Sequence, residues 1–302
     1  SLVNAAKNGK KVLVQIELQA RFDETNNITY AEQMQAAGVE LIFGIPGLKV
    51  HSKICVVEKK VNNKNIRYGF ISTGNLNEDT AKIYTDYTLF TANQKILRDV
   101  NKVFNFLQVH YKLKKYKHLI VSPHYTNSFI VKMIDKEIEN ALAGLASGIK
   151  LKLNAITNFK MIEKLYEASN AGVPIKMIVR GICCLIPGVK GMSENIVVIS
   201  IVDKFLEHPR VYYFANLDKP KIYISSADFM TRNIENRVEV ATPIYDLNLQ
   251  QQIIDVFDIT WNDNVKARRI NGYTQNQFIR NNKSPIRSQL DIYEYYRNND
   301  NL

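Results

Sequence analysis

The chain has 302 residues, of which 46% are hydrophobic and 10% aromatic, so it is too long and too apolar to be a disordered tail. Forty Lys and Arg residues against 29 Asp and Glu residues give a net charge of +11 at pH 7. This charge favours an anionic partner: nucleic acid, an acidic membrane surface or a phosphate-rich substrate. No apolar run is long enough to span a membrane, and the N-terminus lacks the features of a secretory signal peptide, so we expect neither a span nor secretion by that route.

The cysteines indicate a reducing environment. Cys55, Cys183 and Cys184 form neither a C-x-x-C motif nor an even disulfide framework, which predicts buried, reduced thiols in a cytoplasmic protein. The chain starts with Ser and with residues that read as the end of a helix, so we expect it to be a piece of a longer protein.

The first third of the chain has an α/β pattern. Apolar runs of strand length alternate with segments of helical periodicity, and a polar turn separates the third and fourth strands. The predicted elements are strands over 11–18, 39–43, 51–57 and 68–73 and helices over 28–37 and 92–107. In the last helix, six apolar residues from Ile96 to Leu107 share one face, which predicts that this face is buried.

A second cycle of the same kind follows a basic segment, 112–118, which we interpret as a solvated linker. Its predicted elements are strands over 119–123, 149–156 and 173–181 and helices over 127–144 and 159–172. We therefore expect an α/β protein with two domains, 1–117 and 118–302, the second ending in an arm with a short helix over 288–296.

Each half contains a histidine two residues before a cation. His51 precedes Lys53, and His208 precedes Arg210; each pair is followed by a strand, a turn, a second strand and a polar loop, at 72–77 and 225–228. On a strand, residues two apart point to the same face, so the imidazole can attack or donate a proton while the cation holds a phosphate oxygen. The repetition of the unit favours phosphate chemistry more strongly than either motif alone.

This arrangement resembles the phospholipase D superfamily, in which two half-sites meet and one histidine is transiently phosphorylated while the other acts as an acid. Longer strings narrow the resemblance: IELQARFDE, PGLKVHSK, STGNLNEDTAKIYTDY, IVRGICCLIPG and SIVDKFLEHPRVY are similar to the catalytic C-terminal half of type-1 polyphosphate kinase. The resemblance covers nearly the whole chain. It implies two tandem phospholipase D-like α/β domains related by a pseudo-two-fold repeat, each with a mixed sheet flanked by helices.

The resemblance also implies roles for individual residues. His51 is then the nucleophile that accepts the terminal phosphoryl group of ATP, with Lys53 neutralising phosphoryl oxygens. His208 is the candidate general acid. Tyr84, Arg180 and His208 match positions that contact ATP in the family, and Arg21 matches a position associated with magnesium. A guanidinium does not ligate a cation, so we expect Arg21 to bind a phosphate that carries Mg²⁺.

The residues themselves suggest further phosphate ligands. Asn75 and Arg232 lie in or beside the polar loops, and Arg210 belongs to the second histidine unit, where the phospholipase D superfamily has Lys. Arg232 and Arg237 line a phosphate channel or, alternatively, pair with Glu235 and Glu239. A further histidine that some relatives carry is replaced here by Phe70.

The leading hypothesis is reversible transfer of the ATP terminal phosphoryl group to inorganic polyphosphate through a phosphohistidine, with ATP regeneration in reverse. The resemblance implies Mg²⁺ as cofactor, ATP, ADP and polyphosphate as partners, a homo-oligomer, and a cytoplasmic location with peripheral attachment at the inner face of the membrane; no nucleic acid is expected. One alternative is a phospholipase D-type phosphodiesterase acting on lipid or nucleic acid. The other is a non-catalytic basic module that binds nucleic acid.

Overall fold

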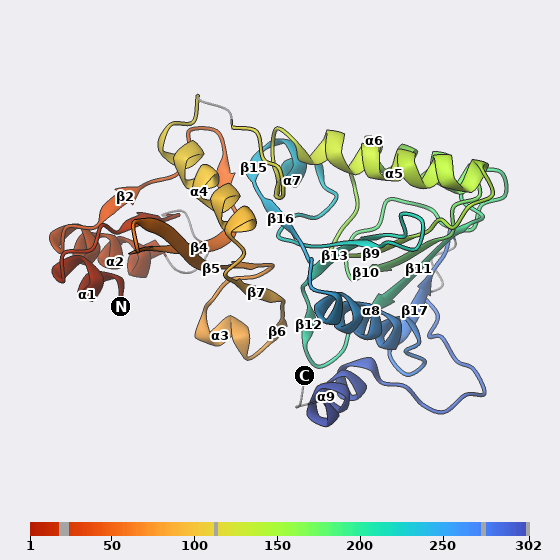
Figure 1. Ribbon diagram of the computed structural model, residues 1–302. Coiled ribbons are helices and arrows are strands. Elements are labelled where there is room, and N and C mark those ends of the chain that lie inside the picture. The colour runs from red at the N-terminus through yellow and green to blue at the C-terminus, as the bar shows by residue number, and fades with distance from the viewer. Residues whose placement is uncertain (18–23, 112–113, 273–275, 300–302) are drawn as a thin grey trace.

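The computed structural model describes residues 1–17, 24–111, 114–272 and 276–299. The first third of the chain forms one side of the molecule and the remainder forms the other, with α4 (Gln94–Gln108) near the line where they meet (Figure 1). The fold is mixed α/β, as predicted, and none of the described helices is long and apolar enough to cross a membrane.

The first part contains two small sheets. Its elements are α1 (Leu2–Lys7), β1 (Leu13–Gln15), α2 (Glu24–Ala36), β2 (Glu40–Ile42), β4 (Lys53–Val61), β5 (Lys64–Ser72), α3 (Glu78–Ala81) and β7 (Thr88–Thr91). Strands β1 and β2 pair in parallel around α2, which gives the predicted strand–helix–strand unit. Strands β4, β5 and β7 form an antiparallel sheet, and α4 packs on one of its faces.

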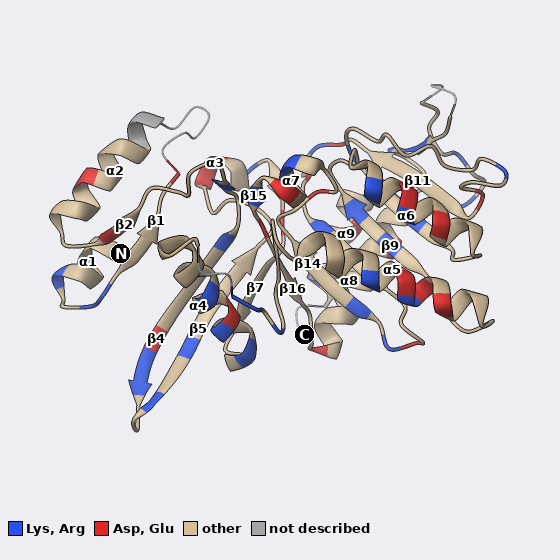
Figure 2. Ribbon diagram, turned by 90° about the horizontal axis from the view of Figure 1, so that it is seen from above, with Lys and Arg blue, Asp and Glu red and all other residues tan. Residues whose placement is uncertain are grey.

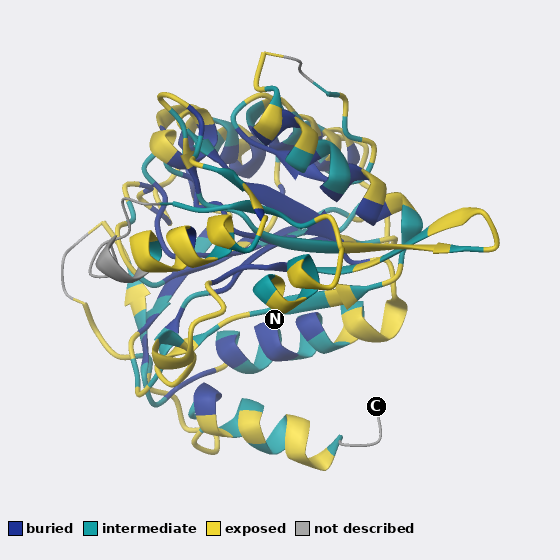
Figure 3. Ribbon diagram, turned by 90° about the vertical axis from the view of Figure 1, so that its left-hand side faces the viewer, coloured by how far each residue is buried: buried dark blue, intermediate teal, exposed yellow. Residues whose placement is uncertain are grey.

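Local sequence explains the two ends of this sheet. Asn62 and Asn63 connect β4 to β5 with φ angles of 48° and 59°, a backbone region that Asn tolerates better than most residues. The tip of this hairpin extends from the body and is exposed (Figure 3). Helix α4 begins where the Asn93 side chain accepts hydrogen bonds from the backbone of Lys95 and Ile96. The predicted apolar face of α4 is buried against the sheet.

The second part is built on one mixed eight-stranded sheet, in the order β17-β11-β10-β9-β13-β14-β16-β8. Its strands are β8 (Ile120–Val121), β9 (Ile149–Leu153), β10 (Ile175–Val179), β11 (Ile196–Ile201), β13 (Arg210–Phe214), β14 (Lys221–Ser225), β16 (Val240–Pro243) and β17 (Ala267–Ile270). Helices α5 (Thr126–Leu142) and α6 (Phe159–Asn170) cover one face, and α8 (Leu247–Trp261) covers the other, with α9 (Ser288–Asn298) packed outside it (Figure 1).

Two short parallel strand pairs join the two parts. Strand β3 (Lys49–Val50) pairs with β15 (Arg237–Val238), which follows α7 (Thr231–Glu235). Strand β12 (Leu206–Glu207) pairs with β6 (Tyr84–Thr85). Each pair therefore contains the strand that ends just before a histidine of one half and a strand from the other half. This reciprocal pairing is the pseudo-two-fold element of the fold.

The structure corrects several sequence expectations. The basic segment before residue 119 is not simply solvated, because the backbone N–H groups of Lys117, His118 and Leu119 donate to Asp99. Cys184 is exposed and the other two thiols are half-buried, so the prediction of three buried thiols is wrong, although all three are free. Strands β11 and β17 and helix α8 were not predicted. The hydrophobic cluster that contains the buried face of α4 also includes Val238 and Val240 from the second part of the chain. The domain boundary between residues 117 and 118 stays a prediction.

Candidate active site

His51 lies at the end of β3 and is held by the other half of the chain. The backbone N–H groups of His51 and Ser52 both donate to the Val238 carbonyl oxygen, at 2.9 and 3.0 Å. The Nδ1 atom of His51 lies 2.9 Å from Oε2 of Glu239, one residue beyond that carbonyl. Because a carboxylate accepts this hydrogen bond, Nδ1 carries the proton and Nε2 carries the lone pair. Nε2 has no hydrogen-bond partner among the residues that the structure describes.

Glu239 is fixed on both of its oxygens. Asn233 Nδ2 donates to Oε1 at 2.6 Å, and Ser226 Oγ donates to Oε2 at 2.5 Å. The carboxylate side chain is 1% exposed, whereas that of His51 is 24% exposed. Burial lowers the pKa of His51 below its usual value of 6.5, and Glu239 offsets this only in part. The imidazole is therefore neutral at pH 7, oriented, and open at Nε2, which are the properties of a nucleophile.

Lys53 completes the first half-site. Its Nζ donates to the backbone carbonyl oxygen of His51. Strand β4 begins only at Lys53, so the expectation that the two residues share a strand is wrong. Burial lowers the pKa of Lys53 to about 8, with Glu239 opposing the shift and Arg210 reinforcing it. The group is thus mostly charged at pH 7 and able to neutralise a phosphoryl oxygen.

The second half-site has the same plan with the halves exchanged. His208 follows β12, and its Nδ1 lies 2.8 Å from Oδ1 of Asp86, which follows β6. Thr73 Oγ1 donates to the same oxygen at 2.6 Å. Each histidine therefore takes its carboxylate from the opposite half, and neither half contains a complete site.

Arg210 links the two halves of the chain beside His208. Its Nη1 lies 3.1 Å from His208 Nε2 and 3.3 Å from the Thr73 carbonyl oxygen, and its Nη2 pairs with Asp228 at 2.9 Å. Burial raises the pKa of Asp228, but Arg210 and two backbone hydrogen bonds outweigh this and keep the pKa below its usual value. Since a guanidinium can only donate, His208 Nε2 accepts in this arrangement.

The nucleotide-binding residues predicted from sequence gather around His208. The ring of Tyr84 lies 5.1 Å from the His208 ring, and Tyr84, Asn75 and Asp86 line one cavity of about 420 Å³. Arg180 follows β10 and donates to Asn154 Oδ1 and to the Glu207 carbonyl oxygen, one residue before His208. This is the carboxyl end of an interior strand, where open α/β sheets bind ligands.

The remaining predicted residues have different outcomes. Arg232 lies exposed on α7, and Arg237 lies on β15; neither forms an ion pair with Glu235 or Glu239 in the part of the chain described. Burial and the neighbouring Arg232 and Arg210 lower the pKa of Arg237, although Glu239 opposes this. Arg21 falls outside the described residues.

The donor set of this site suits phosphate rather than a bare metal ion. Glu239 and Asp86 are committed to histidines and Asp228 to Arg210, and the described residues contain no cluster of three or more potential metal ligands among His, Cys, Asp and Glu. The described side chains therefore do not form a protein-ligated Mg²⁺ site.

Sequence reasoning missed the supporting residues. Asp86 and Glu239 were not assigned as histidine partners, although each stands directly after a short strand in the same relation to its half. The C-terminal arm also contributes: Gln289 on α9 bonds to Phe205 on both its backbone N–H and its carbonyl oxygen, and to Glu207. Arg287 pairs with Asp203 at 2.7 Å. The arm thus holds the segment that leads into His208.

The chain is similar to known proteins over nearly its whole length. The model named "Polyphosphate kinase C-terminal domain 1" matches residues 1–113, and "Polyphosphate kinase C-terminal domain 2" matches residues 119–289. Curated polyphosphate kinases of Escherichia coli K12 and Vibrio parahaemolyticus are each 49% identical to this chain, over 98% and 99% of it. The crystal structure of polyphosphate kinase from Porphyromonas gingivalis superposes with a TM-score of 0.92 at 40% identity, covering 99% of this chain and 46% of that one.

The chain matches less than half of the length of each of these relatives. The chain spans 43% of the length of both curated relatives. Within that span the family models account for both halves of the chain, including both histidine units and both carboxylates that pair with them. The chain therefore belongs to the polyphosphate kinase family and corresponds to its two C-terminal domains.

Proposed function

We propose that this chain carries the catalytic site for transfer of the terminal phosphoryl group of ATP to inorganic polyphosphate, through a phosphohistidine on His51. The observation that carries the proposal is the state of the two imidazoles. His51 has its proton fixed at Nδ1 by Glu239 and its Nε2 without a partner among the described residues, whereas His208 Nε2 lies against Arg210. The family membership supplies the substrate class.

The first step forms the phosphoenzyme. The lone pair of His51 Nε2 attacks the terminal phosphorus of ATP, the N–P bond forms, and the bond from that phosphorus to the bridging oxygen breaks. The electron pair of the broken bond stays on the departing ADP. Glu239 stabilises the positive charge that develops on the imidazole, and His208, in its protonated form and released from Arg210, donates a proton to the leaving oxygen.

The second step extends the polymer. A terminal oxygen of polyphosphate attacks the phosphorus on His51, the new P–O bond forms, and the P–N bond breaks to return its electron pair to Nε2. The chain grows by one phosphate, the His51 imidazole regains its starting state, and His208 takes up a proton from solvent before the next cycle. Since both steps exchange one phosphoryl bond for another, ATP formation from polyphosphate follows the same path in reverse.

Positive charge at the site stabilises the transferring group. Lys53 and Arg237 lie close enough to His51 to lower its pKa, and Arg210 lies against Nε2 of His208. Phosphoryl transfer depends mainly on position and on neutralisation of oxygen charge, which these cations provide. We place ATP in the cavity beside Tyr84, and any Mg²⁺ on its phosphate oxygens rather than on protein carboxylates.

Radiolabelling tests the proposal directly. The full-length protein is incubated with ATP labelled at the terminal phosphate, and acid-labile, alkali-stable label on the protein is measured in wild type, His51→Ala and His110→Ala. His110 is an exposed histidine remote from the pairings described, so its variant is the matched control. We expect label on wild type and His110→Ala and none on His51→Ala. Label surviving on His51→Ala overturns the assignment, and ATP-independent cleavage of lipid or DNA would favour the phosphodiesterase.

A further inference from the structure

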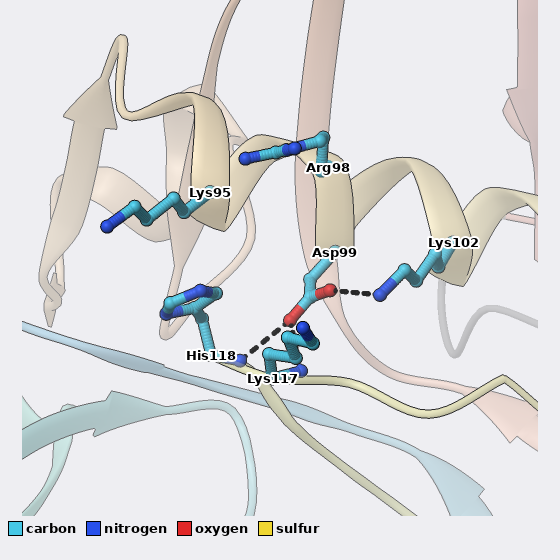
Figure 4. Close-up of a pocket in the computed structure, with 6 residues that line it drawn as sticks. All are labelled: Lys95, Arg98, Asp99, Lys102, Lys117 and His118. Carbon is cyan, nitrogen blue, oxygen red and sulfur yellow. Dashed lines mark hydrogen bonds and ion pairs between the residues drawn. The ribbon is translucent and has the colours of Figure 1, made fainter.

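A second cationic cavity lies on α4, outside the histidine site. Helical spacing brings Lys95, Arg98, Asp99 and Lys102 to one face of the helix, and the segment leading into β8 completes the wall. The cavity has a volume of about 420 Å³ and is lined by Lys95, Arg98, Asp99, Lys102, Lys117 and His118 (Figure 4). Its lining therefore contains four permanently charged cationic side chains and one carboxylate.

The carboxylate organises the cavity without neutralising it. Asp99 is 2% exposed. One of its oxygens accepts from Lys102 Nζ at 2.7 Å, and the other accepts from the backbone N–H groups of Lys117 and His118 at 2.8 and 2.7 Å. Burial opposes ionisation, but these hydrogen bonds outweigh it and keep the pKa of Asp99 below its usual value. Asp99 thus ties the segment at Lys117 and His118 to the helix.

The remaining cations have no acidic partner among the described residues. The side chains of Lys95 and Lys117 are exposed, and the Arg98 guanidinium makes one described hydrogen bond, to the Gln94 carbonyl oxygen. Figure 2 shows basic residues on this helix and along the neighbouring β4–β5 hairpin. Like charges that converge on a concave surface repel each other unless an anion lies between them. Lys95, Arg98 and Lys117 are therefore available to a multiply charged anion.

The cavity lies apart from the histidines, and its residue His118 precedes strand β8, which pairs with β16. Glu239, the partner of His51, directly precedes β16. His118 Nδ1 lies 2.7 Å from the Tyr245 hydroxyl oxygen, at the end of β16 opposite to Glu239. Glu239 and Tyr245 lie six residues apart along this segment, so the cavity is separate from the pair formed by His51 and Glu239. A long linear chain of phosphates has the reach to contact both places.

We propose that this cavity, the α4 site, is a second binding site for inorganic polyphosphate. Lys95, Arg98 and Lys117 bind phosphate oxygens of a polymer whose end occupies the histidine site. The occupancy of two sites by one chain raises the affinity for long polymers without a new contact at the reacting end. The inference rests on the proposed function for the identity of the polymer, and it adds where the distal part of the chain binds.

Binding measurements on the full-length protein test the α4 site. The triple variant Lys95→Gln, Arg98→Gln, Lys117→Gln removes the three available cations and leaves Lys102 and Asp99 in place. The control, Lys132→Gln, Lys160→Gln, Lys219→Gln, removes three exposed cations from the second half of the chain. The dissociation constants of tripolyphosphate and of long-chain polyphosphate are measured for each protein at low and at physiological ionic strength, together with phosphohistidine formation.

We expect the triple variant to bind long-chain polyphosphate at least about tenfold more weakly than the control variant, with a smaller dependence on salt. Tripolyphosphate affinity and phosphohistidine formation should match those of the control, which also shows that the variant is folded. An equal long-chain affinity in the two variants overturns the α4 site. Selective loss of RNA binding with long-chain polyphosphate unaffected overturns the assigned ligand. Absence of phosphohistidine in wild type counts against the proposed function and leaves the affinity comparison valid.

Discussion

The two half-sites share a plan but differ in how firmly each histidine is held and in what its second nitrogen contacts. Glu239 is 1% exposed and bonded on both oxygens, whereas Asp86, the partner of His208, is 20% exposed. His51 Nε2 has no partner in the described chain, whereas His208 Nε2 accepts from Arg210. Both histidines therefore pair with a carboxylate in the same way, and the two half-sites differ in the surroundings of the two imidazoles.

The cation that accompanies each histidine also differs between the two half-sites. Lys53 is a flexible point charge whose pKa is lowered to about 8, while Arg210 is a planar guanidinium fixed by Asp228 and by the Thr73 carbonyl oxygen. Lys53 donates to the carbonyl oxygen of its histidine, whereas Arg210 lies against the Nε2 atom of its histidine. This difference suits nucleophilic attack at His51 and proton transfer at His208.

The largest expected effect on phosphoenzyme formation comes from replacing each histidine by alanine. His51→Ala should lose phosphoenzyme formation completely, whereas His208→Ala should retain it with a rate lower by about 10²- to 10⁴-fold, because only general acid catalysis is lost. Rapid-quench labelling measures both rates. Complete loss in both variants would show that the half-sites are equivalent in the first step.

Removal of the carboxylates should have a graded effect. Glu239→Gln should slow phosphorylation of His51 by roughly 10²-fold or more, since its amide no longer stabilises the charged imidazole. Asp86→Asn, at the more exposed carboxylate, should slow it by roughly tenfold. The same quench experiment compares them. If Asp86→Asn has the larger effect on labelling, the assignment of the nucleophile to the Glu239 pair is wrong.

The pH profile should separate the two groups of the first half-site. His51 must be neutral to attack, and its pKa lies below 6.5, so the labelling rate should hold from pH 7 to 6.5 and fall in more acidic solution. Lys53 must be charged, and its pKa of about 8 predicts a fall above that pH. In Lys53→Arg, the alkaline fall should move to much higher pH. An unchanged alkaline limb would assign it to another group.

Glu239→Gln sharpens this test. Glu239 raises the pKa of His51, so its removal should lower that pKa further and shift the acidic limb to lower pH, even as the maximum rate falls. A shift of the acidic limb to higher pH would contradict the pairing.

The smallest effect is expected at the C-terminal arm. Gln289→Ala removes hydrogen bonds to Phe205 and Glu207 and leaves Glu207 with fewer partners, so the unfolding free energy should fall by about 1–3 kcal/mol. Thermal or denaturant unfolding measures this change. Because the described contacts of the arm reach the segment before His208 and none of the residues around His51, phosphorylation of His51 should be reduced far less than in Glu239→Gln. An equal loss would mean that the arm supports both half-sites.

Sequence predicted the local pattern of the fold and the histidine–cation units well. The amphipathic face of α4 and the strand that positions Arg180 follow from hydrophobic periodicity, which records burial directly. The reciprocal strand pairs did not follow, because two-residue strands such as β3 and β12 have no periodicity of their own. For the same reason Glu239 and Asp86 could not be matched to their histidines: the pairing is set by contacts between residues more than one hundred positions apart.

The contribution of the C-terminal arm was also beyond sequence reasoning. A short helix over 288–296 was predicted and α9 is observed over Ser288–Asn298, but its docking depends on a hydrogen bond from the side chain of Gln289 to Glu207. A polar residue on a partly exposed helix gives no signal of that contact. The basic segment at Lys117 was similarly uninformative until Asp99 was seen to bind its backbone.

The central claim is that His51 attacks through Nε2 because Glu239 holds the proton on Nδ1. The direct test is to trap the phosphoenzyme under alkaline conditions and to identify the phosphorylated residue and ring nitrogen by mass spectrometry and phosphorus NMR. We expect a single phosphohistidine at residue 51, substituted on Nε2. Phosphate on Nδ1 of His51, or on His208, would contradict it.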